Sequence, residues 1–99
     1  MKTYEGERTL AGALVTVDGE KLPPRLDLRT FSRTGFEWTY NGAGPRQLAL
    51  ALLADHLRDD VRAVALLEPF MNAVVAHLDN AWVLTSEAID AALRDLDSA

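Results

Sequence analysis

The 99-residue chain contains no cysteine. This absence excludes a disulfide framework, a thiolate zinc site and a cysteine nucleophile. Only two histidines are present, no apolar run approaches the length of a membrane span, and residues 1–10 lack the apolar segment of a signal peptide. We therefore expect a cytoplasmic protein, and we assign it no metal and no other cofactor.

The charge is unevenly distributed along the chain. The net charge is −5, of which residues 1–47 carry +1 and residues 48–99 carry −6. An acidic half repels a phosphate backbone and can suit a basic partner surface, but ordinary solubility of helix surfaces is the simpler explanation of the charge. With 48% apolar residues, the chain has enough hydrophobic material for the core of one domain.

Alternation of apolar and polar residues predicts strands in the first 40 residues. Asp18-Gly19 is a strong two-residue hairpin turn. Pro23-Pro24 should keep the strand before it short or at a sheet edge. The expected strands are Lys2–Glu5 with a turn or bulge at Gly6, Leu14–Val17, Glu20–Leu22, Arg25–Phe31 and Phe36–Tyr40.

The second half of the chain has helical periodicity. After a Gly-rich connection that ends at Pro45, we expect helices over residues 45–57, about 60–78 and 87–96. Asp59 or Asp60 should cap the second helix, and Thr85 or Ser86 the third. Pro69 interrupts the second pattern and predicts a kink or two abutting helices, while Trp82–Leu84 reads as a short extended link.

These elements predict a single α+β domain over residues 1–99. A small N-terminal antiparallel β-sheet in residues 1–40 packs on three C-terminal α-helices in residues 45–97. The core should include Trp38, Leu53, Val74 and Trp82. Together with Tyr40, the two tryptophans are alternatively a binding patch of aromatic side chains.

Motifs for chemistry are weak. Gly42–Pro45 before a helix resembles an anion-binding loop, but Pro45 removes one amide donor and no nucleotide-binding fingerprint follows. His56 and Asp60 would lie one turn apart on a continuous helix, yet two ligands do not make a metal site. No serine or carboxylate pair is set apart for catalysis, so we expect a protein that is not an enzyme.

Two charged surfaces are candidates for binding. Three acidic residues at a helix end, Asp55, Asp59 and Asp60, are candidate contacts for a partner protein. The only basic cluster comprises Lys21, Arg25, Arg29 and Arg33. With Phe31 beside it, this cluster is a candidate site for single-stranded nucleic acid or an acidic protein, or it simply protects an edge strand.

The chain resembles a family of small uncharacterised proteins that occur in bacteria and on phages and plasmids. The segments that carry the resemblance are MKTYEGERT, VTVDGEKLPPRLDLR, TGFEWTYNGAGPRQLALALLADHL and WVLTSEAID. Pro69 and Asp79-Asn80 depart from the family's pattern, where an uninterrupted helix and a proline-containing turn are more usual. The resemblance implies a compact intracellular domain, an accessory factor of mobile elements, and it transfers no functional residue.

Three functions follow in order of preference. The first is a non-enzymatic domain that binds another protein and acts as a modulator encoded by a mobile element or phage. This function is also compatible with a homo-oligomer. The second is a nucleic-acid-binding module that uses Arg25–Arg33. The third is a small-ligand or enzyme domain centred on the Gly42–Pro45 turn.

Overall fold

The Asp18-Gly19 turn organises the first three strands. In the computed structural model, which describes residues 1–98, β1 (Thr3–Thr9) pairs antiparallel with β2 (Gly12–Val17), and β3 (Glu20–Lys21) returns along β2. Asp18 and Gly19 have φ angles of 50° and 87°. Two successive positive φ angles are the mark of a type I′ hairpin turn, so the predicted turn is confirmed.

The fourth strand comes from the C-terminal half of the chain. β4 (Trp82–Thr85) pairs antiparallel with β1 and gives the sheet the order β3-β2-β1-β4. Two predictions are wrong here, because the expected link is a strand and Gly6 lies inside a continuous β1. Gly6 is opposite Trp82, and a Cβ at this position would overlap the indole ring. Close approach of the ring, and not a turn, is what requires glycine.

Residues 22–42 form an irregular segment without strands, so the predicted strands Arg25–Phe31 and Phe36–Tyr40 are wrong. Positive φ angles at Arg25 (58°) and Thr39 (84°) turn the backbone out of the extended region. The Thr39 N–H donates to the Val75 carbonyl at 3.1 Å instead of to a neighbouring strand. The aromatic alternation still reports burial, since Phe36 and Trp38 are buried while Tyr40 is 51% exposed.

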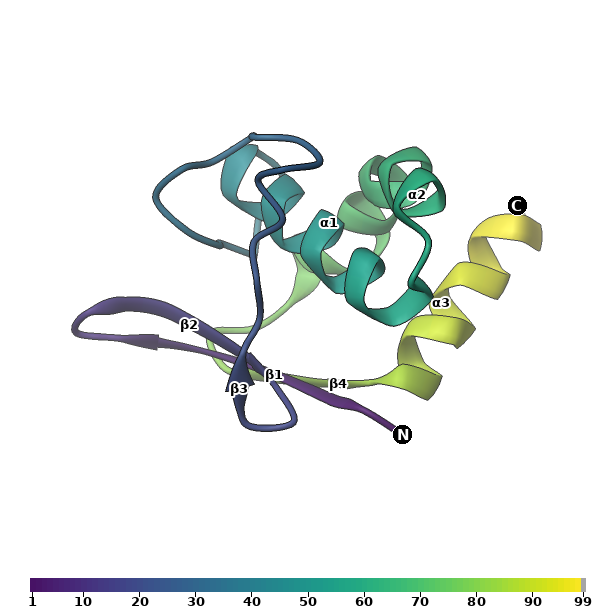
Figure 1. Ribbon diagram of the computed structural model, residues 1–99. Helices are drawn as coiled ribbons and strands as arrows, with labels where there is room; N and C mark the ends of the chain where they lie inside the picture. The colour runs from purple at the N-terminus through teal and green to yellow at the C-terminus, as the bar shows by residue number, and fades with distance from the viewer. Residues whose placement is uncertain (99) are drawn as a thin grey trace.

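Helix α1 (Ala43–Leu57) is the central element. The sequence predicts one apolar stripe, but Leu48 to Ala54 are buried at every position. A helix that is apolar on all sides is covered on all sides. Here the sheet, the irregular segment and the next helix surround it (Figure 1). The helix ends at Arg58, whose φ of 53° places it in the left-handed region and whose N–H donates to Ala54.

Helix α2 (Asp60–Ala73) passes through Pro69 without dividing, because this proline lies on the exposed side of the helix. Asp59 is the N-cap and accepts from the Arg62 N–H at 3.1 Å. The predicted continuation to Leu78 is wrong, since the chain leaves the helix at Val74 and makes the short 3₁₀ turn η1 (Val75–His77). Two carbonyls after the break accept hydrogen bonds from Thr39. The Val75 carbonyl accepts from its N–H, and the Leu78 carbonyl accepts from its hydroxyl at 2.9 Å.

The last helix, α3 (Ser86–Ser98), starts directly from β4. Thr85 caps it by accepting from the Ala88 N–H at 3.1 Å, whereas the Ser86 hydroxyl accepts from the Lys2 N–H at 2.9 Å. Figure 1 shows α1 and α2 above one face of the sheet and α3 at the end of the sheet near the N-terminus. The predicted α+β arrangement of an antiparallel sheet and three helices is therefore confirmed. No helix within residues 1–98 is long and apolar enough to cross a bilayer.

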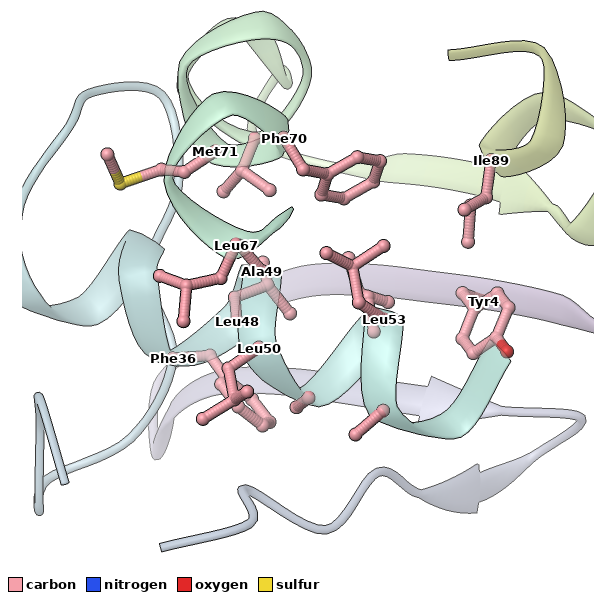
Figure 2. Close-up of a cluster of buried hydrophobic side chains, with 14 of the residues drawn as sticks. Tyr4, Phe36, Leu48, Ala49, Leu50, Leu53, Leu67, Phe70, Met71 and Ile89 are labelled. Carbon is pink, nitrogen blue, oxygen red and sulfur yellow. The ribbon is translucent and has the colours of Figure 1, made fainter. Parts of the chain in front are cut away.

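The hydrophobic core fills the space between the sheet and the helices. Trp38 and Leu53 are fully buried and Trp82 is 7% exposed, while Val74 is partly buried at the border of the core. In Figure 2 Phe36 lies at one end of the cluster, and Tyr4 and Ile89 lie at the other. The Trp38 and Trp82 rings meet edge to face with centroids 5.7 Å apart. The two tryptophans are therefore core residues, whereas Tyr40 is exposed.

Candidate functional site

The Gly42–Pro45 turn is a packing junction. A Cβ at Gly44 would lie 2.7 Å from the Glu37 Cβ, so the start of α1 is pressed against that side chain. Pro45 is buried, and the Arg46 N–H donates to Gly42 at 2.9 Å. The neighbouring glutamate disfavours a bound phosphate or carboxylate, and glycine is present here for close contact.

Asp55, the first of the three acidic candidates, is bound within the protein. Its carboxylate accepts from the Tyr4 hydroxyl at 2.6 Å and from the Lys2 ammonium at 3.1 Å. Tyr4 is fully buried, and burial together with this hydrogen bond raises the pKa of its phenol far above the usual range. The group therefore connects the N-terminal strand to the last turn of α1.

The other two acidic candidates also have partners within the chain. Asp59 caps α2, as described above. The Asp60 carboxylate pairs with the Arg25 guanidinium at 3.1 Å and is 49% exposed. Each acidic residue of the predicted contact surface thus has a role in the fold, and its contact with a partner protein stays a prediction.

Arg25 lies between two carboxylates. Its guanidinium donates to both oxygens of Asp27 at 3.1 Å and to both oxygens of Asp60 at 3.1 and 3.3 Å. Hydrogen bonds to these two acids raise the pKa of Arg25, and the guanidinium lowers the pKa of Asp27. The positive charge of Arg25 is neutralised locally, which leaves little of it for a phosphate backbone.

The remaining members of the basic cluster do not share an extended face with Arg25. The Leu28 N–H donates to the Arg25 carbonyl at 3.1 Å, so the chain turns between Arg25 and Arg29. The Arg29 side chain donates only to the Leu28 carbonyl, at 2.7 Å. Lys21 lies on β3, and neither it nor Arg33 has an ion pair with another residue of the range 1–98.

His56 links two helices. Its Nε2 atom lies 2.6 Å from the Asp90 carboxylate, which joins the end of α1 to α3. His56 and Asp60 belong to different helices, because Arg58 ends α1 between them. Within residues 1–98, no three histidine or acidic side chains gather as ligands for a metal ion. Ser32 is likewise committed to the backbone, donating to Gly35 at 2.9 Å.

Gln47 organises the irregular segment, a role that sequence reasoning missed. Its fully buried amide accepts from the Phe31 and Ser32 N–H groups at 2.8 and 3.1 Å. It also donates to the Pro24 and Arg29 carbonyls at 2.6 and 3.1 Å. Two accepted and two donated bonds satisfy the whole amide. A polar residue at the start of an all-apolar helix was the available signal.

Arg8 is the second residue that sequence reasoning missed. Its guanidinium donates to Asn80 at 2.6 Å, and to Glu37 and the Trp38 carbonyl at 3.0 Å each. It also lies 4.7 Å from the centre of a Trp38 ring, within cation–π range. Arg8 follows Tyr4 and Gly6 at the inward positions of β1, and a cation at an inward strand position was the signal.

One face of the sheet is not covered by a helix within residues 1–98. Side chains alternate between faces along β1, so Tyr4 is buried while Glu5 and Glu7 are exposed. The register places Glu5 between Thr16 and Val83, and Glu7 beside Leu14. Figure 1 shows the helices on the opposite side of the sheet. We use the name outer sheet face for Glu5, Glu7, Leu14, Thr16 and Val83.

The outer sheet face is hollowed and acidic. It borders an open cavity of about 350 Å³, and Val83 is 62% exposed beside it. Glu5 and Glu7 form no ion pair with any other residue in the range 1–98. Unlike the predicted acidic trio, these two carboxylates are free to meet a partner.

With this geometry in place, comparison with known proteins gives one match. Residues 4–95 match a family of unknown function, DUF6166. The chain belongs to this family. No curated protein and no solved structure matches the chain.

The residues that match DUF6166 include all four strands except the first residue of β1, and nearly all of the helices. It assigns no activity and no catalytic residue, because the family's function is unknown. Function must therefore be argued from the surfaces of this molecule and not from its fold.

Proposed function

We propose that this DUF6166 protein is a non-enzymatic binding domain whose outer sheet face docks a basic amphipathic helix of another protein. The observation that carries the proposal is the pair of unpaired carboxylates, Glu5 and Glu7, on a hollowed sheet face that no helix within residues 1–98 covers.

The apolar part of the face supplies the area for association. Val83 on β4 and Leu14 on β2 flank the central strand on opposite sides. Val83 is 62% exposed, and burying such a side chain in an interface is favourable by about 1.5–3 kcal/mol. A partner that covers both residues must also cross the glutamates between them.

The charges select the partner. Glu5 and Glu7 occupy successive outward-facing positions of β1, so their Cα atoms are about 7 Å apart. Their carboxylates therefore repel each other. Lysine or arginine side chains of a partner relieve that repulsion. Their electrostatic attraction to the glutamates becomes stronger as the interface excludes water. A nucleic-acid backbone adds negative charge to the same face and is repelled.

A helix is the occupant that fits this sheet. The inner face packs against α1, while the outer face of an antiparallel sheet is commonly left to solvent and is therefore open to an added helix. A helix with apolar residues at spacings of three and four and cations beside them matches the arrangement of Val83, Leu14 and the glutamates. Its apolar side chains would occupy the hollow.

We extend the proposal to the setting of the protein. The resemblance described above supports an accessory modulator carried by a mobile element or phage, acting on a host protein in the cytoplasm. The non-enzymatic part is supported by the engagement of Asp55, His56 and Ser32 in bonds that hold the fold.

The test uses a defined probe, a helical peptide of leucine and lysine with one apolar face, and a control peptide of the same length in which glutamate replaces lysine. In ¹⁵N-labelled protein, the basic peptide should shift the amide resonances of Glu5, Glu7 and Val83, and the acidic peptide should not. The double variant Glu5→Lys/Glu7→Lys should weaken binding at least about tenfold, the effect of one lost charge pair of about 1.4 kcal/mol.

The matched control is Asp79→Lys/Asp95→Lys, which changes the net charge equally at exposed acids outside the outer sheet face. Equal weakening by both double variants would contradict the proposal, because attraction by net charge alone would explain it. Binding of single-stranded oligonucleotides, lost in Arg29→Glu or Arg33→Glu, would instead favour the nucleic-acid function.

A further inference from the structure

A second surface lies where the irregular segment meets the start of α2. Leu28 and Arg29 from the segment and Asp60, Val61 and Val64 from the helix line an open groove of about 260 Å³. Both charged surfaces considered from the sequence, the acidic and the basic one, contribute a residue to it. We name this surface the Leu28–Val64 groove.

The groove is apolar and has no cover. Val61 lies in the first turn of α2 and is 80% exposed, whereas Ala63 and Leu67 of the same helix are buried. Leu28 and Val64 are partly buried and pack against the core, so they form the floor of the groove. A large exposed aliphatic side chain next to a preformed apolar floor is the arrangement of an interface anchor site.

The groove is small and open to solvent. Sites for drug-sized molecules and cofactors commonly enclose about 300–1,000 Å³, and this groove is both smaller and open. One large apolar side chain of a partner fits the space. Such anchors in pockets supply much of the energy of peptide recognition.

The charge around the groove selects the residues that flank the anchor. Both oxygens of the Asp60 carboxylate accept from Arg25, so they are not free to bind a cation of a partner. Arg29 lines the groove, its guanidinium donates to the neighbouring Leu28 carbonyl, and it has no ion pair with another residue of the range 1–98. A carboxylate of a partner would accept hydrogen bonds from the Arg29 guanidinium and neutralise its charge.

From these observations we infer that the Leu28–Val64 groove binds an acidic segment of a partner protein, which inserts one large apolar side chain beside Val61 and gives a carboxylate to Arg29. This site is separate from the outer sheet face and takes a segment of opposite charge. Its success or failure is therefore independent of the function proposed above.

The probe is an eight-residue peptide with a central leucine between aspartates. Two control peptides replace the leucine by alanine or the aspartates by lysine. Titration into the ¹⁵N-labelled 99-residue protein should shift the amide resonances of Leu28, Val61 and Val64. Arg29→Glu should weaken binding at least about tenfold. The matched charge control Arg33→Glu, outside the groove, should change binding less than about twofold.

Val61→Ser should also weaken binding without unfolding, because the side chain is exposed in the free protein. The inference is overturned if the aspartate–leucine peptide shifts none of the three resonances at millimolar concentration. It is equally overturned if the alanine peptide binds as well, or if both arginine variants lose binding equally. Concentration-dependent shifts at these residues without peptide would assign the groove to a second copy of the chain, and would also overturn it.

Discussion

The Tyr4 hydroxyl donates to the Asp55 carboxylate at 2.6 Å, and this bond joins the central strand of the sheet to the end of the central helix. The same carboxylate accepts from Lys2, so two residues near the start of the chain and one at the end of α1 form one polar cluster. Figure 2 shows Tyr4 at the edge of the buried cluster, with its oxygen directed away from the apolar side chains. The cluster gives the first prediction.

Stability should fall at alkaline pH because of Tyr4. Its pKa in the folded protein is raised above the ordinary 10.0, so the folded state holds the phenol proton more tightly than the unfolded state. The resulting stabilisation is complete below pH 10.0 and is lost as the pH rises above it. Urea unfolding between pH 8 and 11 measures this loss. In Tyr4→Phe the loss should be smaller, whereas Tyr40→Phe, at an exposed tyrosine, should behave like wild type.

The three acidic residues near the end of α1 should differ in their effect on stability. Asp55→Ala leaves a buried tyrosine hydroxyl without an acceptor and should cost about 2–3 kcal/mol. Asp59→Ala removes a helix cap and should cost about 1 kcal/mol. Asp60→Ala breaks an exposed ion pair and should cost about 0.5 kcal/mol. Equal losses in chemical denaturation would contradict the assigned contacts.

Reversal of all three acids tests the acidic contact surface originally expected from the sequence. The triple change Asp55→Lys, Asp59→Lys and Asp60→Lys should destabilise the fold before it affects any partner. Loss of binding in a triple variant with an unchanged melting temperature would restore that surface as the partner site. Arg25→Glu/Arg29→Glu is the matched reversal of the basic cluster.

Gln47→Ala should release the irregular segment. Four hydrogen bonds are lost, and the buried N–H groups of Phe31 and Ser32 lose their acceptor, for a cost of about 3 kcal/mol. Hydrogen exchange followed by mass spectrometry should show faster exchange in residues 24–35 than in the helices. Unchanged exchange in that segment would mean that the buried side chains at Leu22 and Phe36 suffice to hold it.

Gly6→Ala should destabilise the sheet through Trp82. The new methyl group overlaps the indole ring, and overpacking of this kind costs about 1–3 kcal/mol. Trp82→Leu removes the overlapping ring, so the double variant should be less destabilised than the sum of the two single changes. A purely additive double variant in thermal unfolding would rule out direct contact as the cause.

Trp38→Ala should cost about 3–5 kcal/mol, as expected for a fully buried aromatic residue. Part of the loss comes from Arg8, which contacts both the ring and the carbonyl of this residue. A near-neutral variant that loses partner binding would instead assign Trp38 to a functional surface. Circular dichroism during thermal unfolding distinguishes the two results.

The local signals of the sequence located most elements correctly. The Asp18-Gly19 turn, the start of α1 at the glycine–proline connection and the cap at Asp59 all depend on a few adjacent residues. Glu5 and Glu7 alternate with Tyr4 and Gly6 in the sequence, but the turn or bulge expected at Gly6 ended the predicted strand before Glu7.

Tertiary contacts caused the failures. The period-two pattern in Phe36–Tyr40 arises because Phe36 and Trp38 enter the core from a loop, and periodicity alone does not distinguish this from a strand. Trp82–Leu84 is a strand because it pairs with β1, where Gly6 leaves room for the indole ring. The partners of Asp55 (Lys2 and Tyr4) and of Asp60 (Arg25) are likewise distant in sequence, so no spacing rule could identify them.

The pairing of β1 with β4 has a consequence for how the chain folds. Tyr4 meets Leu84 in the register, and the Lys2 N–H bonds to Ser86, 84 positions further along the chain. The sheet therefore cannot be completed on the ribosome until Thr85 has left the exit tunnel, and until then β1 has a free hydrogen-bonding edge. Closing so long a loop is entropically expensive and slows folding. Until Thr85 emerges, the glutamate-bearing strand of the nascent chain can pair only with β2.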